Sequence, residues 1–288
     1  MTLAELKIKL LACLNKLYNP REAKAIAKRY YLEKLQLSPQ LFIVNPDAKL
    51  SEGQEAYVLT DIIRFQTNEP LQYILGYEYF CDHKFFVNHH TLIPRPETEM
   101  LVQLADPHLR SGIKVLDIGT GSGCLAISIA LLNPEANVNA IDISDEALAI
   151  AIENQKTLGA DNVQFSYEDI IYPSTNFLKL SWNIIVSNPP YIPISEMGKM
   201  EKNVVGFEPH SALFVPDADP LLFYKAILNY ALQTLILEKG IVLLECHTDI
   251  VNSVGELFAK EFKSVQIYND LNNRPRFVSA TNISLGKL

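Results

Sequence analysis

An Asn-Pro-Pro-Tyr motif that begins at Asn188 combines residue types that could hold a flat nitrogen group. It follows the apolar run 184–186, and Pro189 and Pro190 must end that strand because proline donates no backbone hydrogen bond and fixes φ near about −65°. The Asn188 side-chain carbonyl and the Pro189 backbone carbonyl could then accept both hydrogens of one NH₂ group, with Tyr191 stacked on the group that carries it. A simple strand-ending turn explains the prolines but not the asparagine and tyrosine that flank them.

Amide and exocyclic-amine nitrogens suit such a clamp. They are poor nucleophiles because their lone pair is delocalised. Holding both N–H bonds while a sulfonium methyl group lies in line at ~3 Å lowers the barrier by positioning and by polarising the nitrogen. No strong general base is required if the proton leaves after transfer. The motif therefore predicts a site that holds a planar nitrogen, with Asn188, Pro189, Pro190 and Tyr191 as the candidate catalytic and substrate-binding residues.

A glycine-rich loop, Gly119-Thr120-Gly121-Ser122-Gly123, joins a predicted strand to a predicted helix. Its glycines permit a tight turn and let a ligand approach the main chain beside a helix N-terminus. Such a loop can also serve only to pack a strand against a helix. The spacing lacks the later glycine of the dinucleotide fingerprint, and no Gly-Lys-Ser/Thr marks a nucleoside triphosphate site. Its place between a strand and a helix favours ligand binding.

Two carboxylates end the next two predicted strands. Asp142 follows Gly123 by 19 residues and could accept hydrogen bonds from both hydroxyls of a ribose. It could instead cap the following helix, a role for which Ser144 is equally suited. Asp169 and Ile170 would offer adenine an acceptor for its exocyclic amine beside an apolar wall. These residues predict an adenosine ligand, and they leave both NAD and S-adenosylmethionine open.

Strands and helices alternate from about residue 97 onward. The predicted strands are 114–119, 137–143, 162–169, 182–188 and 240–246, followed by two short ones at 264–270 and 276–282. Short apolar strands separated by helices predict a doubly wound, mostly parallel α/β sheet covered on both faces. Ligands of such sheets bind at the carboxyl ends of the strands, where all the residues named above lie.

Residues 1–75 are predicted to form a small helical domain, and residues 76–96 a β-hairpin linker. The α/β domain then occupies residues 97–288. Asn19 before a proline and Ser51 before Glu-Gly-Gln are typical helix starts. In the linker, His89 and His90 are expected on opposite faces of a strand, so a shared metal is not expected.

Composition limits the possible partners. The net charge of −8 disfavours binding to a phosphate backbone, which requires a basic face. The four cysteines show no paired spacing, so we expect neither disulfides nor zinc, and a reducing, cytoplasmic setting. The N-terminal helix is amphipathic rather than a signal peptide, and no window has the apolar length of a membrane span.

Two further motifs and the surroundings of the glycine loop carry a resemblance to a known family. Besides the Asn-Pro-Pro-Tyr motif, the chain contains Gln-Tyr-Ile-Leu-Gly at 72–76 and Leu-Ile-Pro-Arg-Pro-Glu-Thr-Glu at 92–99, and the glycine loop lies within Leu-Asp-Ile-Gly-Thr-Gly-Ser-Gly-Cys-Leu-Ala-Ile at 116–127. Together they resemble the peptide chain release factor glutamine methyltransferases, the HemK/PrmC family, over essentially the whole chain. The Asn-Pro-Pro-Tyr motif alone is shared with DNA adenine and some ribosomal methyltransferases.

The resemblance implies a Rossmann-like S-adenosylmethionine-dependent methyltransferase that modifies the side-chain amide nitrogen (N5) of the glutamine in the GGQ motif of class I release factors, in translation termination. It implies cofactor binding by Gly119, Thr120, Gly121, Ser122, Gly123, Asp142, Asp169, Ile170 and Asn188. It further implies substrate binding by residues 188–191 and a contribution of Arg95 and Glu97 to the site.

The chain departs from the family pattern at 243–247, Leu-Leu-Glu-Cys-His, and within 208–221. We expect these departures to affect peripheral contacts rather than the chemistry. The residues leave two alternatives, a nucleic-acid exocyclic-amine (adenine N6-type) methyltransferase and a non-catalytic adenosine-binding module. We expect no metal, no membrane, no direct nucleic-acid partner and a monomer.

Overall fold

The computed structural model describes residues 1–236 and 240–283. The chain divides into two compact units. The first contains Met1–Tyr77 together with Glu201–Phe207, and the second contains Glu78–Met200 and the described residues from Glu208 onward. The domain predicted at 97–288 also includes residues 237–239 and 284–288, which lie outside the described part of the chain. No helix among the described residues combines the length and apolar character that crossing a membrane requires.

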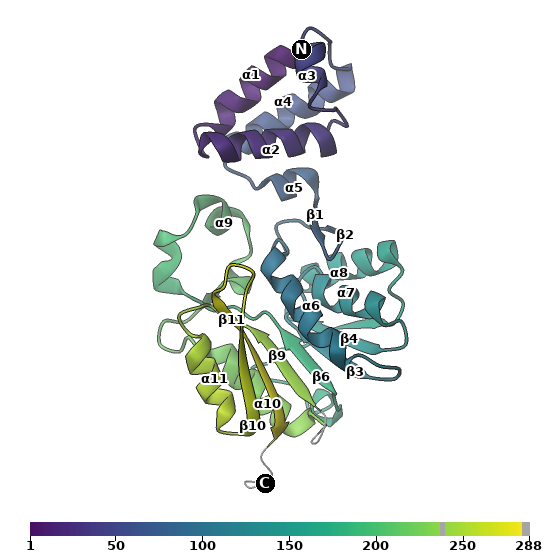
Figure 1. Ribbon diagram of the computed structural model, residues 1–288, viewed down its shortest axis with the longest axis vertical. Helices are drawn as coiled ribbons and strands as arrows, with labels where there is room; N and C mark the ends of the chain where they lie inside the picture. The colour runs from purple at the N-terminus through teal and green to yellow at the C-terminus, as the bar shows by residue number, and fades with distance from the viewer. Residues whose placement is uncertain (237–239, 284–288) are drawn as a thin grey trace. The chain divides into compact units, whose positions relative to one another are not determined.

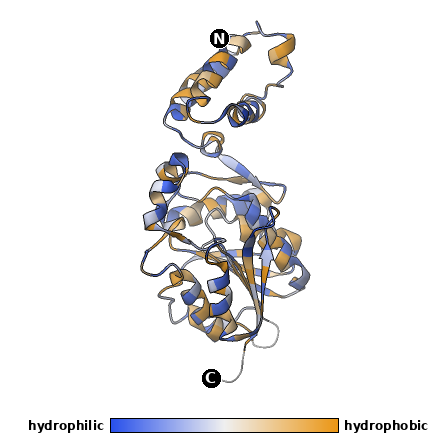
Figure 2. Cartoon of the chain, turned by 60° about the vertical axis from the view of Figure 1, so that its left-hand side comes forward, coloured by the Kyte–Doolittle hydropathy of each residue, from blue (hydrophilic) through white to orange (hydrophobic). Residues whose placement is uncertain are grey.

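The first unit is helical. It contains α1 (Leu3–Leu14), α2 (Pro20–Glu33), α3 (Leu41–Val44), α4 (Glu52–Gln66), α5 (Leu71–Leu75) and, from the distant segment, α9 (Lys202–Phe207). The two predicted helix starts are confirmed, because Asn19 accepts hydrogen bonds from the first backbone amides of α2 and Ser51 forms a capping box with Gln54. Blue and orange stretches on these helices in Figure 2 show their amphipathic character.

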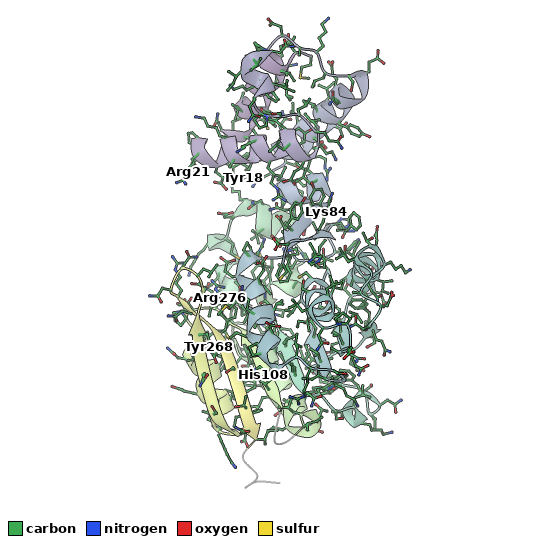
Figure 3. The ribbon with its side chains drawn as sticks, turned by 45° about the vertical axis from the view of Figure 1, so that its right-hand side comes forward. Tyr18, Arg21, Lys84, His108, Tyr268 and Arg276 are labelled. Carbon is green, nitrogen blue, oxygen red and sulfur yellow. The ribbon has the colours of Figure 1, made fainter. Side chains whose placement is uncertain are left out.

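Helix α9 joins the first unit although its sequence lies far downstream. The Tyr18 side chain, labelled in Figure 3, is hydrogen-bonded with Asn203 of α9. Nothing in the six-residue sequence of α9 predicted this association.

The second unit contains, within the described residues, a seven-stranded sheet (Figure 1). Its strands are β3 (Lys114–Ile118), β4 (Asn137–Asp142), β5 (Val163–Tyr167), β6 (Ile184–Ser187), β9 (Ile241–Glu245), β10 (Phe262–Asn269) and β11 (Pro275–Ile283). Their order is β10-β11-β9-β6-β3-β4-β5, and the pairs from β9 to β5 are parallel. The predicted doubly wound, mostly parallel fold is therefore confirmed.

The last two strands differ from the prediction. They are the longest of the sheet, with 8 and 9 residues, and β11 lies antiparallel between β9 and β10. Both are longer than predicted: β10 begins two residues before the predicted range 264–270, and β11 extends one residue beyond each end of the predicted range 276–282. A small parallel pair, β7 (Ile192–Pro193) with β8 (Phe214–Val215), was also not predicted.

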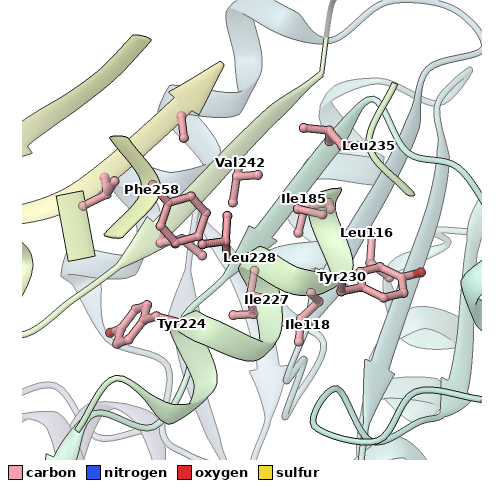
Figure 4. Packing of buried hydrophobic residues seen from close by; sticks show 14 of the residues in the cluster. Leu116, Ile118, Ile185, Tyr224, Ile227, Leu228, Tyr230, Leu235, Val242 and Phe258 are labelled. Carbon is pink, nitrogen blue, oxygen red and sulfur yellow. The ribbon is translucent and has the colours of Figure 1, made fainter. Parts of the chain in front are cut away.

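Helices cover both faces of the sheet. On one face, α6 (Glu99–Ala105) and α7 (Cys124–Leu132) pack in a core that also receives Phe80 and Phe85 from the hairpin β1 (Tyr77–Phe80) and β2 (His83–Phe86). On the other face, α10 (Leu222–Thr234) and α11 (Val251–Ala259) pack on Leu116, Ile185 and Val242 (Figure 4). Helix α8 (Asp145–Leu158) packs beside β5 and β4. These two cores hold the carboxyl ends of β3, β4, β5 and β6 together at one edge.

Candidate active site

A cavity opens at the carboxyl ends of the parallel strands of the second unit. Its empty volume is about 960 Å³ including the solvent at its mouth. Gly119 and Gly121 line it from the loop after β3, Asp142 from the end of β4, Asp169 from the segment after β5, and Asn188 from the segment after β6. The structure thus brings together residues that the sequence separates by up to 69 positions.

The three glycines of the loop have different surroundings. Gly119 and Gly121 have φ of +75° and +56°, and a Cβ atom on either would have no neighbouring atom within 4 Å. Gly123 has φ of +80°, but a Cβ there would lie 3.0, 3.1 and 3.2 Å from side chains of α7, α8 and β5. The first two glycines therefore leave room for a ligand against the main chain, whereas Gly123 permits close packing of helix and strand and lines neither of the cavities described here.

The other two loop residues face a smaller hollow that adjoins the main cavity. Thr120 and Ser122 line this hollow together with Thr98, and it shares Asn188 with the main cavity. The Thr120 hydroxyl donates a 2.7 Å hydrogen bond to the carboxylate of Asp117, which is buried. Burial raises the pKa of Asp117 to about 7.

Asp142 is anchored by backbone amides. Its Oδ2 accepts a hydrogen bond from Gly121 N–H at 2.9 Å, and its Oδ1 accepts one from Ser144 N–H at 3.0 Å. Ser144, not Asp142, caps α8, since its hydroxyl accepts from Ala147 N–H. Burial raises the pKa of Asp142, while the amide hydrogen bonds act in the opposite direction. Each oxygen keeps a lone pair, so the carboxylate can still accept hydrogen bonds from a diol in the cavity.

Asp169 and Ile170 form the far wall of the cavity. Asp169 Oδ1 accepts a 2.8 Å hydrogen bond from Ile171 N–H, and Ile170 is buried in the core beneath α10. The neighbouring Glu168 also lines the cavity. A carboxylate beside an apolar wall is the arrangement that the sequence predicted for adenine.

His90 lines the cavity as well and was not proposed from the sequence. Its ring centroid lies 3.9 Å from that of His89, so the expectation that the two rings face opposite ways was wrong. The physical reason is that residues 89–90 form a turn rather than a strand. Among the described residues, no group of three or more potential metal ligands is present.

The Asn-Pro-Pro-Tyr motif follows β6 directly. Ser187 donates a hydrogen bond to the carbonyl of Ile118 at 2.7 Å and so ties β6 to β3. Asn188 Nδ2 donates to Thr98 Oγ1 at 3.1 Å, and Pro189 and Pro190 line the main cavity.

Tyr191 takes a different position from the other three residues of the motif, since it lines neither cavity. Its hydroxyl pairs with Arg276, its ring centroid lies 5.9 Å from that of His247, and it packs against the core beneath α10. Burial raises its pKa to about 12, so the phenol is neutral. In this arrangement the ring is not placed to stack on a group in the cavity.

The two linker residues assigned to the site also differ from each other. Arg95 lines the smaller hollow and forms a 2.6 Å ion pair with Glu208, whose other oxygen accepts from Ile93 N–H at 3.1 Å. Glu208 is only 3% exposed, so this pair fixes the linker to the segment that begins at Glu208. Glu97 lines neither cavity.

The cysteines of the second unit provide no nucleophile. Burial raises the pKa of Cys81 to about 11 and those of Cys124 and Cys246 to about 12. Because the thiolate rather than the thiol attacks, these side chains are inert at neutral pH. The site therefore contains acceptors and a shaped cavity rather than a covalent nucleophile.

Several residues at the site had no assigned role in the sequence analysis. They are His90, Thr98, Glu168, Glu208, Glu245 and Arg276. Glu245 carries a signal that could have identified it, because it ends a buried strand as Asp142 does. The partners of Thr98 and Glu208 lie 90 to 147 residues away, and local sequence gives no sign of them.

Comparison with known proteins agrees with this geometry. Residues 109–263 match the family model of a methyltransferase domain, and residues 12–76 match that of the PrmC N-terminal domain. The release factor glutamine methyltransferase of Bacteroides thetaiotaomicron is 38% identical over 93% of this chain and 95% of its own length. Those of Flavobacterium psychrophilum and Lactococcus lactis are 40% and 39% identical over 84% and 78% of this chain, and over 86% and 83% of their own lengths. The resemblance inferred from the motifs is thereby confirmed: this chain belongs to the release factor glutamine methyltransferase family.

Proposed function

We propose that this protein uses S-adenosylmethionine to methylate the side-chain amide nitrogen (N5) of the glutamine in the GGQ motif of class I peptide chain release factors. One observation carries the proposal. Asn188, Pro189 and Pro190 line the same cavity as the two open glycines and Asp142. An amide-holding group and an adenosine-binding group therefore share one site.

The residues present fit S-adenosylmethionine. The open space over Gly119 and Gly121 admits a ligand against the main chain, Asp142 has acceptor capacity for ribose hydroxyls, and Asp169 with Ile170 offers adenine an acceptor and an apolar wall. When bound, S-adenosylmethionine supplies a methyl group on a sulfonium. The cavity lining includes Asp142, Glu168 and Asp169, and carboxylates are favourable surroundings for a positively charged ligand.

The protein's contribution to the chemistry is positioning. Asn188 Oδ1 and the Pro189 carbonyl accept the two N–H bonds of the substrate amide, which fixes the plane of the nitrogen and polarises it. Rigid prolines after β6 hold both acceptors in one orientation. The proton leaves after methyl transfer, so the site requires no strong base.

The finer statements about partners belong to the same proposal. The protein works as a monomer in the cytoplasm and does not bind nucleic acid, which is supported by its net charge of −8. The helical first unit contacts the body of the release factor, since no cavity of the catalytic unit described above draws on its residues. Light scattering during gel filtration tests the monomer, and a mass of twice 32.4 kDa would refute it.

Methyl transfer can be tested directly. The full chain is incubated with methyl-labelled S-adenosylmethionine and purified release factor, and the modified residue is mapped by mass spectrometry. We expect label on the GGQ glutamine and none on a release factor in which that glutamine is alanine. Label on DNA or ribosomal RNA instead of the release factor would refute the proposal and favour the nucleic-acid alternative.

The non-catalytic alternative is tested with Asn188→Ala. We expect turnover to be lost while the Kd for S-adenosylmethionine changes little. An active wild-type protein rules out a binding module, and a large loss of cofactor affinity would make Asn188 chiefly a cofactor contact.

The role of the helical unit needs a test on the intact chain. Removing residues 1–75 would also remove the partners of α9, so lost activity could not be attributed to lost recognition. Hydrogen exchange of the full chain with and without release factor avoids this problem. Protection of amides in α1–α5 is expected, and unchanged exchange there would contradict the assignment.

A further inference from the structure

A chain of three side chains leads from the buried interior of the second unit to Asn188. Asn188 Nδ2 donates to Thr98 Oγ1 at 3.1 Å, and Thr98 Oγ1 in turn donates to Glu245 Oε2 at 2.7 Å. Thr98 is 5% exposed and Glu245 is 1% exposed. Neither takes part in holding the cofactor as described above.

The direction of this chain is set by chemistry. An ionised carboxylate only accepts hydrogen bonds, so the single proton of the Thr98 hydroxyl must point to Glu245. The hydroxyl can then only accept on its other side. The Asn188 amide has one donating end and one accepting end, and only its NH₂ group can satisfy Thr98. Its carbonyl oxygen is thereby turned away from Thr98.

The carboxylate is itself held in place. Arg276, at the start of β11 and labelled in Figure 3, lies 3.5 Å from Glu245 Oε1, and its Nε lies 3.3 Å from Asp270. The Tyr224 hydroxyl donates to the backbone carbonyl of Glu245 at 2.9 Å. Burial raises the pKa of Glu245, whereas the Thr98 hydroxyl and the Arg276 guanidinium act in the opposite direction and favour the charged carboxylate, which accepts from Thr98.

The fold explains why these three residues meet. Strands β6 and β9 are parallel neighbours, and their last pair joins Ser187 to Leu244, so Asn188 and Glu245 follow side by side. Thr98 ends the 3₁₀ turn Pro96–Thr98 that precedes α6, which packs near β9. The hydroxyl thus lies between the two strand ends.

We propose that Thr98 and Glu245 are positioning residues, which lock the Asn188 amide with its oxygen, and not its NH₂ group, toward the substrate amide. The inference rests on the proposed function, since it specifies how the same site recognises an amide. If the Asn188 side-chain amide could rotate freely, it would present its NH₂ group to the NH₂ group of the substrate in half of its orientations, and two donors cannot form a hydrogen bond. The lock also gives selectivity: it favours a glutamine side chain, which donates, over a glutamate side chain, which only accepts.

Removal of the hydroxyl gives the main test. Thr98→Val keeps the shape and leaves the Asn188 NH₂ group without a partner, so kcat should fall roughly 10- to 100-fold with the Kd for S-adenosylmethionine unchanged. Thr98→Ser is the matched control, because it retains the hydroxyl and should keep most of the activity. Glu245→Gln should lose less than Thr98→Val, since its carbonyl can still accept from Thr98. An unchanged kcat in Thr98→Val would overturn the proposal.

Two further measurements separate positioning from a general structural role. The double variant Thr98→Val with Asn188→Ala should be no slower than Asn188→Ala alone, whereas losses that multiply would overturn the coupling. Binding of a release factor with glutamate in place of the GGQ glutamine should strengthen relative to the glutamine form in Thr98→Val. An unchanged ratio of the two Kd values would overturn the lock.

The proposed function and the positioning role of Thr98 can be refuted separately. If the wild-type protein does not methylate release factor, the proposed function is wrong. If the wild type methylates the glutamine but Thr98→Val does so equally well, only the positioning role is wrong. Unfolding midpoints of the variants, followed by Trp182 in the core of the same unit, show whether they are folded.

Discussion

Replacing Asp117 with asparagine should change how the stability of the second unit depends on pH. Asp117 is 1% exposed at the carboxyl end of β3. Burial raises the pKa of its carboxyl to about 7, against an ordinary value of 3.8, and the hydrogen bond from Thr120 lowers it only in part. Between these two values the folded protein keeps a proton that the unfolded chain has released.

The sign and the magnitude follow from proton linkage. Because the folded state binds the extra proton, the free energy of unfolding falls as pH rises from about 4 to about 7 and then levels off. A difference of about 3 pKa units corresponds to about 4 kcal/mol, of which roughly 2–3 kcal/mol lies between pH 5 and pH 8. Asp117→Asn stays neutral, and its carbonyl can still accept from Thr120. The variant should therefore gain stability relative to wild type by that amount between pH 5 and pH 8.

The assay uses the single tryptophan of the chain. Trp182 is buried in the core beneath α10, so its fluorescence follows unfolding of the second unit by urea. Unfolding free energies of wild type and Asp117→Asn are compared at pH 5, 6, 7 and 8. Asp161→Asn, at an exposed turn between α8 and β5, is the matched control and should parallel wild type. A difference between Asp117→Asn and wild type that stays constant across this range would refute the reasoning.

Three other substitutions give separate outcomes. Gly121→Ala and Gly112→Ala both place a Cβ at positive φ, so each should lower the free energy of unfolding by ~1–2 kcal/mol. Only Gly121 lines the cavity, so only Gly121→Ala should also weaken S-adenosylmethionine binding, as measured by calorimetry. Asp142→Asn should weaken cofactor binding roughly tenfold or more, because a charged acceptor is lost; equal affinity would exclude a ribose contact. Arg95→Ala should lower the free energy of unfolding by about 2–3 kcal/mol, because it leaves Glu208 buried without its cation. Adding Glu208→Gln should restore part of this loss, and additive losses in the double variant would contradict the pairing.

The parts of the fold that depend on nearby residues could be predicted from the sequence. Asn19 and Ser51 cap helices because their partners lie two or three residues away. The glycine loop could be placed because a buried strand precedes it and an apolar helix follows. Helix α6 was missed because it has only seven residues and no side-chain cap. Its position matters, since it begins directly after Thr98.

The candidate site could be predicted only where it follows strand ends. Asp142 and Asn188 were proposed because a parallel sheet brings the carboxyl ends of its strands to one edge. The role of Arg95 was proposed without its partner, because Glu208 is 113 residues away. Tyr191 was predicted to stack on the substrate group, and its contact with Arg276 depends on β11 inserting between β9 and β10, which no local pattern indicates.

The departures from the family pattern fall beside the predicted chemistry rather than in it. In the segment 243–247, Glu245 accepts a hydrogen bond from Thr98, while Cys246 lies in the core and the ring of His247 lies near that of Tyr191. In the other segment, residues 214–221 line neither cavity, whereas Glu208 pairs with Arg95 and Pro209, Ser211 and Ala212 line the main cavity. Since the amide lock needs a carboxylate at the end of β9 and a hydroxyl at position 98, a substitution of either residue should matter more than all the changes at 246–247 and 214–221 together.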